Sequence, residues 1–300
     1  MITLIALLPI FALFFLMVIM EKPAYIAGPI SLVITSIVAM KFWGMDSTWF
    51  YVSMIRGSFI ALEIIMILVG TILMIAVLKK AGSFSIINRL IFRFSKDVRV
   101  HAIFLAWFGV AFIEGIAGFG TPSMIMAPLM VYLGFSPLAA IVATLIGDGV
   151  AVSFGAIGVP MSIGIFQGVS AEQAVQLGEN FVSNVSIVTA AFHLVLGIFL
   201  PLLIICMINF IHERSIKKAL AAWKFAIVSG ASFTIPYFLI AYLLGPEFPS
   251  IFGSVIGALI VIYIIRKKFL LPKEEWIFEN IHNTTPVSYT HLTLPTNREV

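Results

Sequence analysis

A few ionisable side chains lie inside long apolar runs of the sequence, namely Glu63, Glu114, Asp148 and His193. Even on a lenient scale, a charge at the centre of a membrane-spanning helix costs about 2.5–3.5 kcal/mol, so each of them is a candidate functional residue. Glu114 precedes a glycine-rich stretch, and Asp148 stands between two glycines. A carboxyl group that is protonated in an apolar phase and ionised when wetted can carry a proton. We therefore expect proton coupling from Glu114 first and Asp148 second.

Each of these residues also has a structural explanation. Glu63 follows Arg56 by seven residues, two helical turns along one face, so a structural ion pair between them explains Glu63 as well as function does. His193 is best explained as a packing histidine with a hydrogen-bond partner. Glu114 and Asp148 could be neutral acids that hold an irregular backbone, although we favour function for both.

Two glycine-rich interruptions divide the segment that carries Glu114 and Asp148. Residues 115–120 lead into Pro122, and residues 147–158 lead into Pro160. Proline favours the first turn of a helix, where its missing N–H would be unpaired. Unwound backbone in lipid costs several kcal/mol per unsatisfied group unless it is buried or lines a wet cavity. We predict two broken or re-entrant helices, and a binding site explains the pair better than close glycine packing does.

The composition defines the elements that position these residues. Of the 300 residues, 61% are hydrophobic and 11% are charged, which excludes a soluble enzyme, a secreted disulfide scaffold and a disordered tail. A spanning helix takes about 20 apolar residues, so we predict an all-α, polytopic protein of the lipid bilayer with about nine to ten membrane segments. The net charge of +4 comes from cations in a few loops and indicates no nucleic-acid partner.

The apolar runs and the basic loops also predict the spans and their orientation. Spans are expected at residues 2–20, 25–43, 59–78, 181–210, 225–244 and 250–265, with an interfacial stretch around Trp49 and Tyr51. Residues 79–99 form the strongest cationic cluster, including Arg99, and should face the cytoplasm. The acidic loop at residues 170–180 belongs outside.

The end of the chain differs from the rest. Residues 287–300, VSYTHLTLPTNREV, are polar and aperiodic and resemble a translated sequencing adapter. We therefore expect a membrane transporter domain at residues 1–286, truncated at its C-terminus, followed by a non-native tail at residues 287–300.

No motif supports a different chemistry. The sequence has no H-E-x-x-H, no phosphate-binding loop and no G-x-S-x-G elbow, and its one cysteine, Cys206, excludes a thiolate metal cluster. Asp148 is the only aspartate in an apolar run, whereas an aspartyl protease needs two. We expect no catalytic residue, no metal and no cofactor.

Three motifs, taken together and in this order, resemble the L-lactate permease family. They are EGIAGFGTP at residues 114–122, GFSPL at residues 134–138 and AVSFGAIGVP at residues 151–160, and the resemblance extends over about residues 56–276. It implies a carrier of the bacterial inner membrane that moves L-lactate, glycolate or related 2-hydroxy monocarboxylates with a proton. Family members are longer than this chain. The chain departs from the family pattern at Thr121 and at Asp148.

The two lines of reasoning give one mechanistic hypothesis. The helix N-termini at Pro122 and Pro160 direct N–H groups at a small carboxylate, while Glu114 or Asp148 binds the coupled proton. The expected substrate-binding residues are Gly118, Gly120, Thr121, Ser123, Ser153 and Gly155, with the hydroxyl groups bonding the 2-hydroxyl of the substrate. A second, inverted repeat would complete the site.

Other classes remain open at this point. A sodium-coupled carrier of another small organic anion would use unwound carbonyl groups and Asp148 as ion ligands. A channel would need a continuous polar lining, and a membrane-embedded enzyme would need a convergent catalytic pair. The oligomeric state is not indicated by any pattern.

Overall fold

The structure is a computed structural model that describes residues 2–82, 95–165, 180–272 and 274–278. Within these ranges the regular structure is entirely helical, as predicted. The chain divides into two compact units, Met1–Leu68 and Val69–Val300.

The first unit contains a packed pair of apolar helices. Helix α1, Ile2–Phe14, continues as the π-helical turn η1, Phe15–Ile19, and packs against α2, Ala24–Phe42. Helix α3, Ser47–Lys80, then runs without interruption into the second unit. The stretch around Trp49 and Tyr51 is thus the start of the same helix as the predicted span at residues 59–78, and its interfacial position stays a prediction. The side chain of Glu63 lies outside the described residues, and so does the expected ion pair with Arg56.

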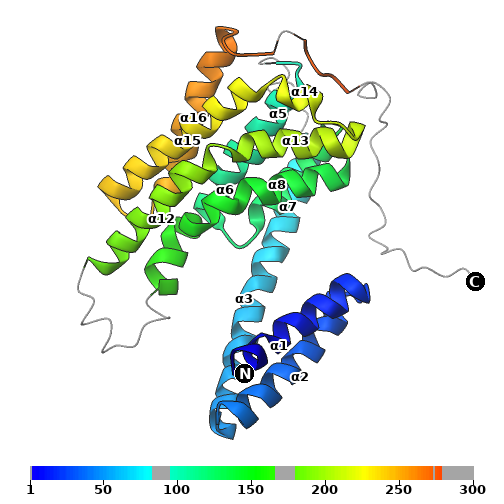
Figure 1. The fold of residues 1–300 in the computed structure, drawn as a ribbon, viewed down its shortest axis with the longest axis vertical. Helices are drawn as coiled ribbons and strands as arrows, with labels where there is room; N and C mark the ends of the chain where they lie inside the picture. Colours follow the sequence, from blue (N-terminus) through cyan, green and yellow to red (C-terminus); the bar gives the residue numbers. More distant parts are fainter. Residues whose placement is uncertain (1, 83–94, 166–179, 273, 279–300) are drawn as a thin grey trace, which may run out of the picture. The chain divides into compact units, whose positions relative to one another are not determined.

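The second unit carries the interrupted segments and the helices that cover them (Figure 1). Its elements are α5 Val98–Ile103, η2 Phe104–Gly109, α6 Val110–Ala117, α7 Thr121–Tyr132, α8 Pro137–Ala151, η3 Val152–Phe154, α9 Gly155–Val159, η4 Pro160–Gly164, α12 Phe181–Gly197, α13 Leu200–Glu213, α14 Lys217–Leu220, α15 Trp223–Leu244 and α16 Pro249–Arg266. Helices α15 and α16 form a hairpin whose arms lie side by side (Figure 1). This α15–α16 hairpin packs against α6 and α12.

Several of these helices can span a membrane. Among the described residues, five are long and apolar enough, and the number rises to six if a bent pair counts as one span. The bent pair is α12 and α13, which meet at 45°. The span predicted at residues 181–210 therefore corresponds to this bent pair, whose two arms are long and apolar enough to cross a membrane only when they are taken together. Gly197 ends the first arm, and Pro201 occupies the first turn of the second, where proline is favoured.

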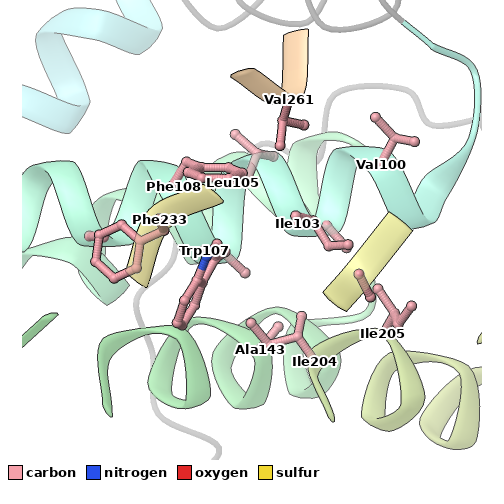
Figure 2. Close-up of a cluster of buried hydrophobic side chains, with 14 of the residues drawn as sticks. Val100, Ile103, Leu105, Trp107, Phe108, Ala143, Ile204, Ile205, Phe233 and Val261 are labelled. Carbon is pink, nitrogen blue, oxygen red and sulfur yellow. The ribbon is translucent and has the colours of Figure 1, made fainter. Parts of the chain in front are cut away.

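The core of the second unit is built around η2. Trp107 is fully buried and meets Phe233 of α15 edge to face, with 5.0 Å between ring centroids. In Figure 2 the indole ring lies between two parts of the structure. The ribbon of α5 and η2 lies on one side of the ring, and Ala143 of α8 and Ile204 of α13 lie on the other. Residues of α8, α13, α15 and α16 thus share one apolar core around the span that carries Glu114.

Some helix crossings are so close that main chain meets main chain. A β-carbon built on Gly147 of α8 would lie 1.6 Å from the carbonyl oxygen of Ala106. A β-carbon on Gly230 of α15 would lie 2.2 Å from the carbonyl oxygen of Ile198. Such contacts are possible only for glycine and are typical of helix packing in membranes.

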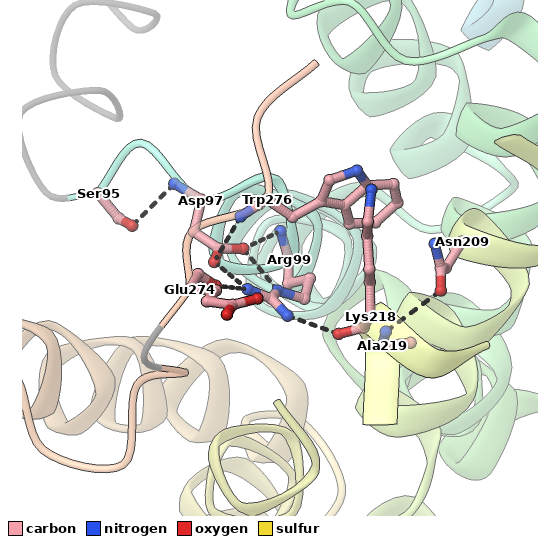
Figure 3. A network of polar contacts seen from close by, with 8 residues as sticks. All are labelled: Ser95, Asp97, Arg99, Asn209, Lys218, Ala219, Glu274 and Trp276. Atoms are coloured by element: carbon pink, nitrogen blue, oxygen red, sulfur yellow. Dashed lines mark hydrogen bonds and ion pairs between the residues drawn. The ribbon is translucent and has the colours of Figure 1, made fainter. Parts of the chain in front are cut away.

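A buried polar network fixes the start of α5 (Figure 3). The Arg99 Nε donates to Asp97 Oδ1 at 2.8 Å, and both side chains are 3% exposed or less. Arg99 also donates to the carbonyl oxygens of Lys218 and Glu274, and the Trp276 N–H donates to Asp97. Arg99 belongs to the basic cluster predicted to face the cytoplasm, and the structure shows that its charge is paired inside the protein, whereas the side of the membrane stays a prediction.

Candidate functional site

The first interruption lies where the sequence predicts it. Helix α6 ends at Ala117, and Gly118, Phe119 and Gly120 follow with φ angles of +63°, +54° and +77°. The Thr121 N–H donates to the Gly118 carbonyl oxygen at 3.0 Å, and the Thr121 hydroxyl donates to the same oxygen. Glycine adopts positive φ without steric cost, so the two glycines let the chain turn before α7 begins.

The second interruption follows α8. After Ala151 the chain forms the 3₁₀ turn η3, and a left-handed run at residues 156–158 then has φ angles of +45°, +56° and +76°. Pro160 begins the π-helical turn η4. The structure describes the predicted half-helix at residues 160–169 only as far as residue 165. The expectation that the N-terminus of this half-helix binds a carboxylate stays a prediction.

The two interruptions touch each other. A β-carbon built on Gly118 would lie 2.8 Å from the β-carbon of Ala156. A β-carbon on Gly155 would lie 2.2 Å from Oε1 of Glu114. The expected site glycines Gly118 and Gly155 therefore lie where the breaks meet.

The two candidate proton-coupling acids lie at this junction. Glu114 is 1% exposed, and its Oε2 is buried without a hydrogen-bond partner in the structure. Asp148 is half-buried, and its Oδ1 is likewise buried and unpaired. The two carboxyl groups interact electrostatically across the packed helices α6 and α8. A buried polar atom without a partner is destabilising by about 1–3 kcal/mol, so the junction has unused capacity to bind a proton or a ligand.

The predicted hydroxyl ligands differ in their availability. The Ser123 Oγ, in the first turn of α7, is buried and has no hydrogen-bond partner in the structure. Thr121 already donates its hydroxyl hydrogen inside the first break. Ser153 lies in η3 and is half-buried, whereas Gly120 is exposed. Among the described residues, no group of three or more His, Cys, Asp or Glu side chains could hold a metal ion.

Three further residues hold the second interruption, and sequence reasoning assigned none of them to the site. The Tyr237 hydroxyl donates to the carbonyl oxygen of Val150 at 2.9 Å, and Nδ1 of His193 lies 2.8 Å from that hydroxyl. The Ser250 hydroxyl donates to the carbonyl oxygen of Ala151 at 2.9 Å. The prediction that His193 is a hydrogen-bonded packing histidine is confirmed. Tyr237 and Ser250 lie 87 and 99 residues from their partners, and no local pattern marks them.

Long apolar helices that are interrupted by two facing breaks, with buried acids at the junction, define a multi-pass membrane protein. A sequence profile of the L-lactate permease family matches residues 2–293. The chain belongs to this family, whose members are transporters and not enzymes.

Curated relatives carry matching names. The L-lactate permease of Bacillus subtilis (strain 168) is 33% identical over 254 residues, which cover 84% of this chain and 42% of the relative. The L-lactate permease of Escherichia coli (strain K12) is 30% identical over 272 residues, covering 88% and 46%. The glycolate permease GlcA of the same strain is 27% identical over 255 residues, covering 85% and 43%. The chain thus spans less than half the length of these relatives. No solved structure gave a significant match.

Proposed function

We propose that this chain belongs to a proton-coupled symporter of L-lactate, glycolate and related 2-hydroxy monocarboxylates in the bacterial inner membrane. The observation that carries the proposal is the junction of the two breaks, where the carboxyl groups of Glu114 and Asp148 interact with each other and each keeps one buried oxygen without a hydrogen-bond partner. The names of the relatives support the substrate class.

The carboxyl pair supplies the coupling. Two carboxylates side by side in apolar surroundings repel each other, and a proton held between them removes the repulsion. When the pair binds a proton and the site binds an anion, the loaded site carries no added net charge across the bilayer. Such compensation lowers the barrier to moving a monocarboxylate through an apolar region.

The substrate is proposed to bind at the start of α7. The positive end of this helix and the N–H groups of its first turn favour a carboxylate. The unpaired Ser123 hydroxyl, one residue after Pro122, bonds the 2-hydroxyl group. Glu114 lies across the Gly118 turn from this helix start, so proton and anion are bound within one junction.

The hydrogen bonds at the second break favour a proton over sodium as the coupling ion. Sodium would require main-chain carbonyl oxygens as ligands, together with Asp148. The carbonyl oxygens of Val150 and Ala151, the nearest to the end of α8, accept hydrogens from Tyr237 and Ser250. One of the two lone pairs of each oxygen is therefore already used by the fold, which makes both carbonyl groups poorer ligands for sodium.

The complete transporter is proposed to extend beyond this chain. More than half of each of the relatives named above lies outside the matched region. We propose that residues 1–286 form the N-terminal part of an inverted-repeat transporter, with about nine to ten membrane segments. The second repeat contributes the opposite wall of the site.

Uptake into proteoliposomes tests the proposal. The product of the complete gene is reconstituted, and accumulation of labelled L-lactate is measured under an inward proton gradient and, separately, under an inward sodium gradient. Accumulation driven by protons alone is expected. Accumulation driven only by sodium would contradict the coupling, and no accumulation under either gradient would contradict the substrate.

A further inference from the structure

We propose that Tyr237 and Ser250 are positioning residues of the candidate site, because their hydroxyl groups fix the point at which α8 stops being α-helical. The inference deepens the proposed function and rests on it, since this point, Ala151, lies three residues after Asp148. Both residues belong to the α15–α16 hairpin, and both are 0% exposed.

The last two carbonyl groups of α8 accept hydrogen bonds from outside the helix. In a continuous α-helix, the carbonyl oxygen of Ala151 would accept from the N–H of Gly155. That N–H instead donates to Val152, which makes the turn 3₁₀. Ser250 donates to Ala151, and Tyr237 donates to the preceding carbonyl oxygen, that of Val150. Because polar groups without partners are costly in apolar surroundings, these hydroxyls stabilise the opening of the helix at this residue.

The direction of the Tyr237 hydroxyl is set by its neighbours. A tyrosine hydroxyl has one hydrogen, and here Val150 receives it. Nδ1 of His193, 2.8 Å away, must therefore supply the hydrogen of the second bond. The tyrosine ring meets Phe154 edge to face at 5.2 Å, and a β-carbon on Gly253 would lie 3.0 Å from that of Tyr237. The ring is thus held against Phe154, and the main chain of Tyr237 packs closely against Gly253.

The same hairpin contacts the rest of the junction. A β-carbon on Gly158, in the left-handed run, would lie 2.5 Å from the carbonyl oxygen of Pro246. A β-carbon on Gly115, next to Glu114, would lie 2.8 Å from the main-chain nitrogen of Ile251. The hairpin therefore touches both breaks, and the two hydroxyl bonds attach it to the helix end that carries Asp148.

Thiol labelling tests the positioning role without requiring transport. A reporter cysteine is placed by Gly149→Cys in a Cys206→Ala background, because residue 149 is exposed and a β-carbon there meets no atom within 4 Å. Tyr237→Phe is compared with Tyr242→Phe, a tyrosine of the same helix that is 61% exposed. Ser250→Ala is compared with Ser254→Ala, a buried serine that donates to Ile251 within its own helix.

We expect Tyr237→Phe and Ser250→Ala each to raise the alkylation rate at position 149 by about five-fold, because each variant loses one hydrogen bond. The two control variants should leave this rate unchanged. A second reporter, Gly57→Cys in the first unit, has a similarly open position and should not respond. Equal rates in all variants would overturn the proposal. A rise at both reporters would overturn it too, because it would indicate general loosening.

Transport kinetics then separate positioning from stability. In the complete gene product, Tyr237→Phe should raise the KM for L-lactate by about five-fold, with Vmax per molecule nearly unchanged. A fall in Vmax at constant KM would be the effect of lost folded protein and would contradict positioning. If the unmodified transporter takes up no lactate, the proposed function fails, and the labelling experiment still decides the role of the two hydroxyls.

Discussion

The main chain of Gly155 lies directly against the carboxyl group of Glu114. A β-carbon at residue 155 would be 2.2 Å from Oε1 and 3.0 Å from Cδ of that side chain. The backbone of Gly155 has φ −69° and ψ 164°, a conformation open to any residue. Space, and not backbone conformation, is therefore the reason that glycine is required here.

Gly155→Ala should displace the Glu114 carboxyl group and reduce proton-driven accumulation of L-lactate. Overpacking of this kind is destabilising by about 1–3 kcal/mol, which corresponds to roughly five-fold to a hundred-fold. The matched control is Gly149→Ala, since a β-carbon there meets no atom within 4 Å. Uptake by both variants is measured in proteoliposomes at equal protein content. Unchanged accumulation in Gly155→Ala would show that the carboxyl position is unimportant.

Glu114→Gln should separate accumulation from exchange. The amide keeps the shape of the carboxyl group but cannot release a proton, so uphill uptake under a proton gradient should be lost. Exchange of labelled for unlabelled L-lactate should continue, because it needs no net proton movement. Asp148→Asn should reduce accumulation less, and Glu275→Gln, at an exposed position, should have no effect. Persistence of uphill uptake in Glu114→Gln would assign the proton to another group.

Ser123→Ala should weaken selection for a 2-hydroxyl group. Loss of one hydrogen bond corresponds to about five-fold in affinity, and it should affect L-lactate but not propionate, which lacks the hydroxyl. Competition by the two acids against labelled L-lactate gives the ratio directly. Ser229→Ala is the control, since that buried hydroxyl donates to Phe225 of its own helix. Equal weakening for both acids would contradict a contact with the 2-hydroxyl.

The buried Asp97–Arg99 pair should matter more for stability than the exposed Glu213–Lys218 pair. Asp97→Asn leaves the guanidinium buried without its counter-charge, a loss of about 3–5 kcal/mol. Glu213→Gln breaks a pair whose side chains are 30% and 53% exposed, worth about 0.2–1 kcal/mol. Thermal unfolding in detergent should show a fall in Tm of roughly 5 °C or more for the first variant only. Similar Tm values for both variants would refute the structural role of the network.

The glycine and proline pattern predicted the two breaks and their order along the chain. Gly118 and Gly120 allow positive φ, and Pro122 begins the next helix, all of which are local effects. The charges of Glu114 and Asp148 inside apolar runs marked the junction. Their mutual approach was not predictable, because it depends on the packing of α6 against α8.

Features that depend on distant partners were missed. Tyr237 and Ser250 are ordinary residues of apolar helices until the fold brings the end of α8 to them. Arg99 was assigned to a loop by its charge, and only the position of Asp97 and the carbonyl oxygens of Lys218 and Glu274 makes it a buried residue. Pro201 was a local indication of the bend after Gly197. The prediction did not use it, because the residues on both sides of Pro201 form one continuous apolar run.

The contact between Gly147 and Ala106 has a mechanical consequence. Side chains between two helices can change rotamer and let the helices slide, whereas two main chains in direct contact have no such layer. We therefore expect α8 and η2 to turn about this crossing as one rigid lever. A small rotation there would be carried along α8 to Asp148, one residue beyond the pivot. Asp148, next to the pivot, would then move least, and the largest displacements would occur at the ends of α8 and η2 that lie farthest from the crossing.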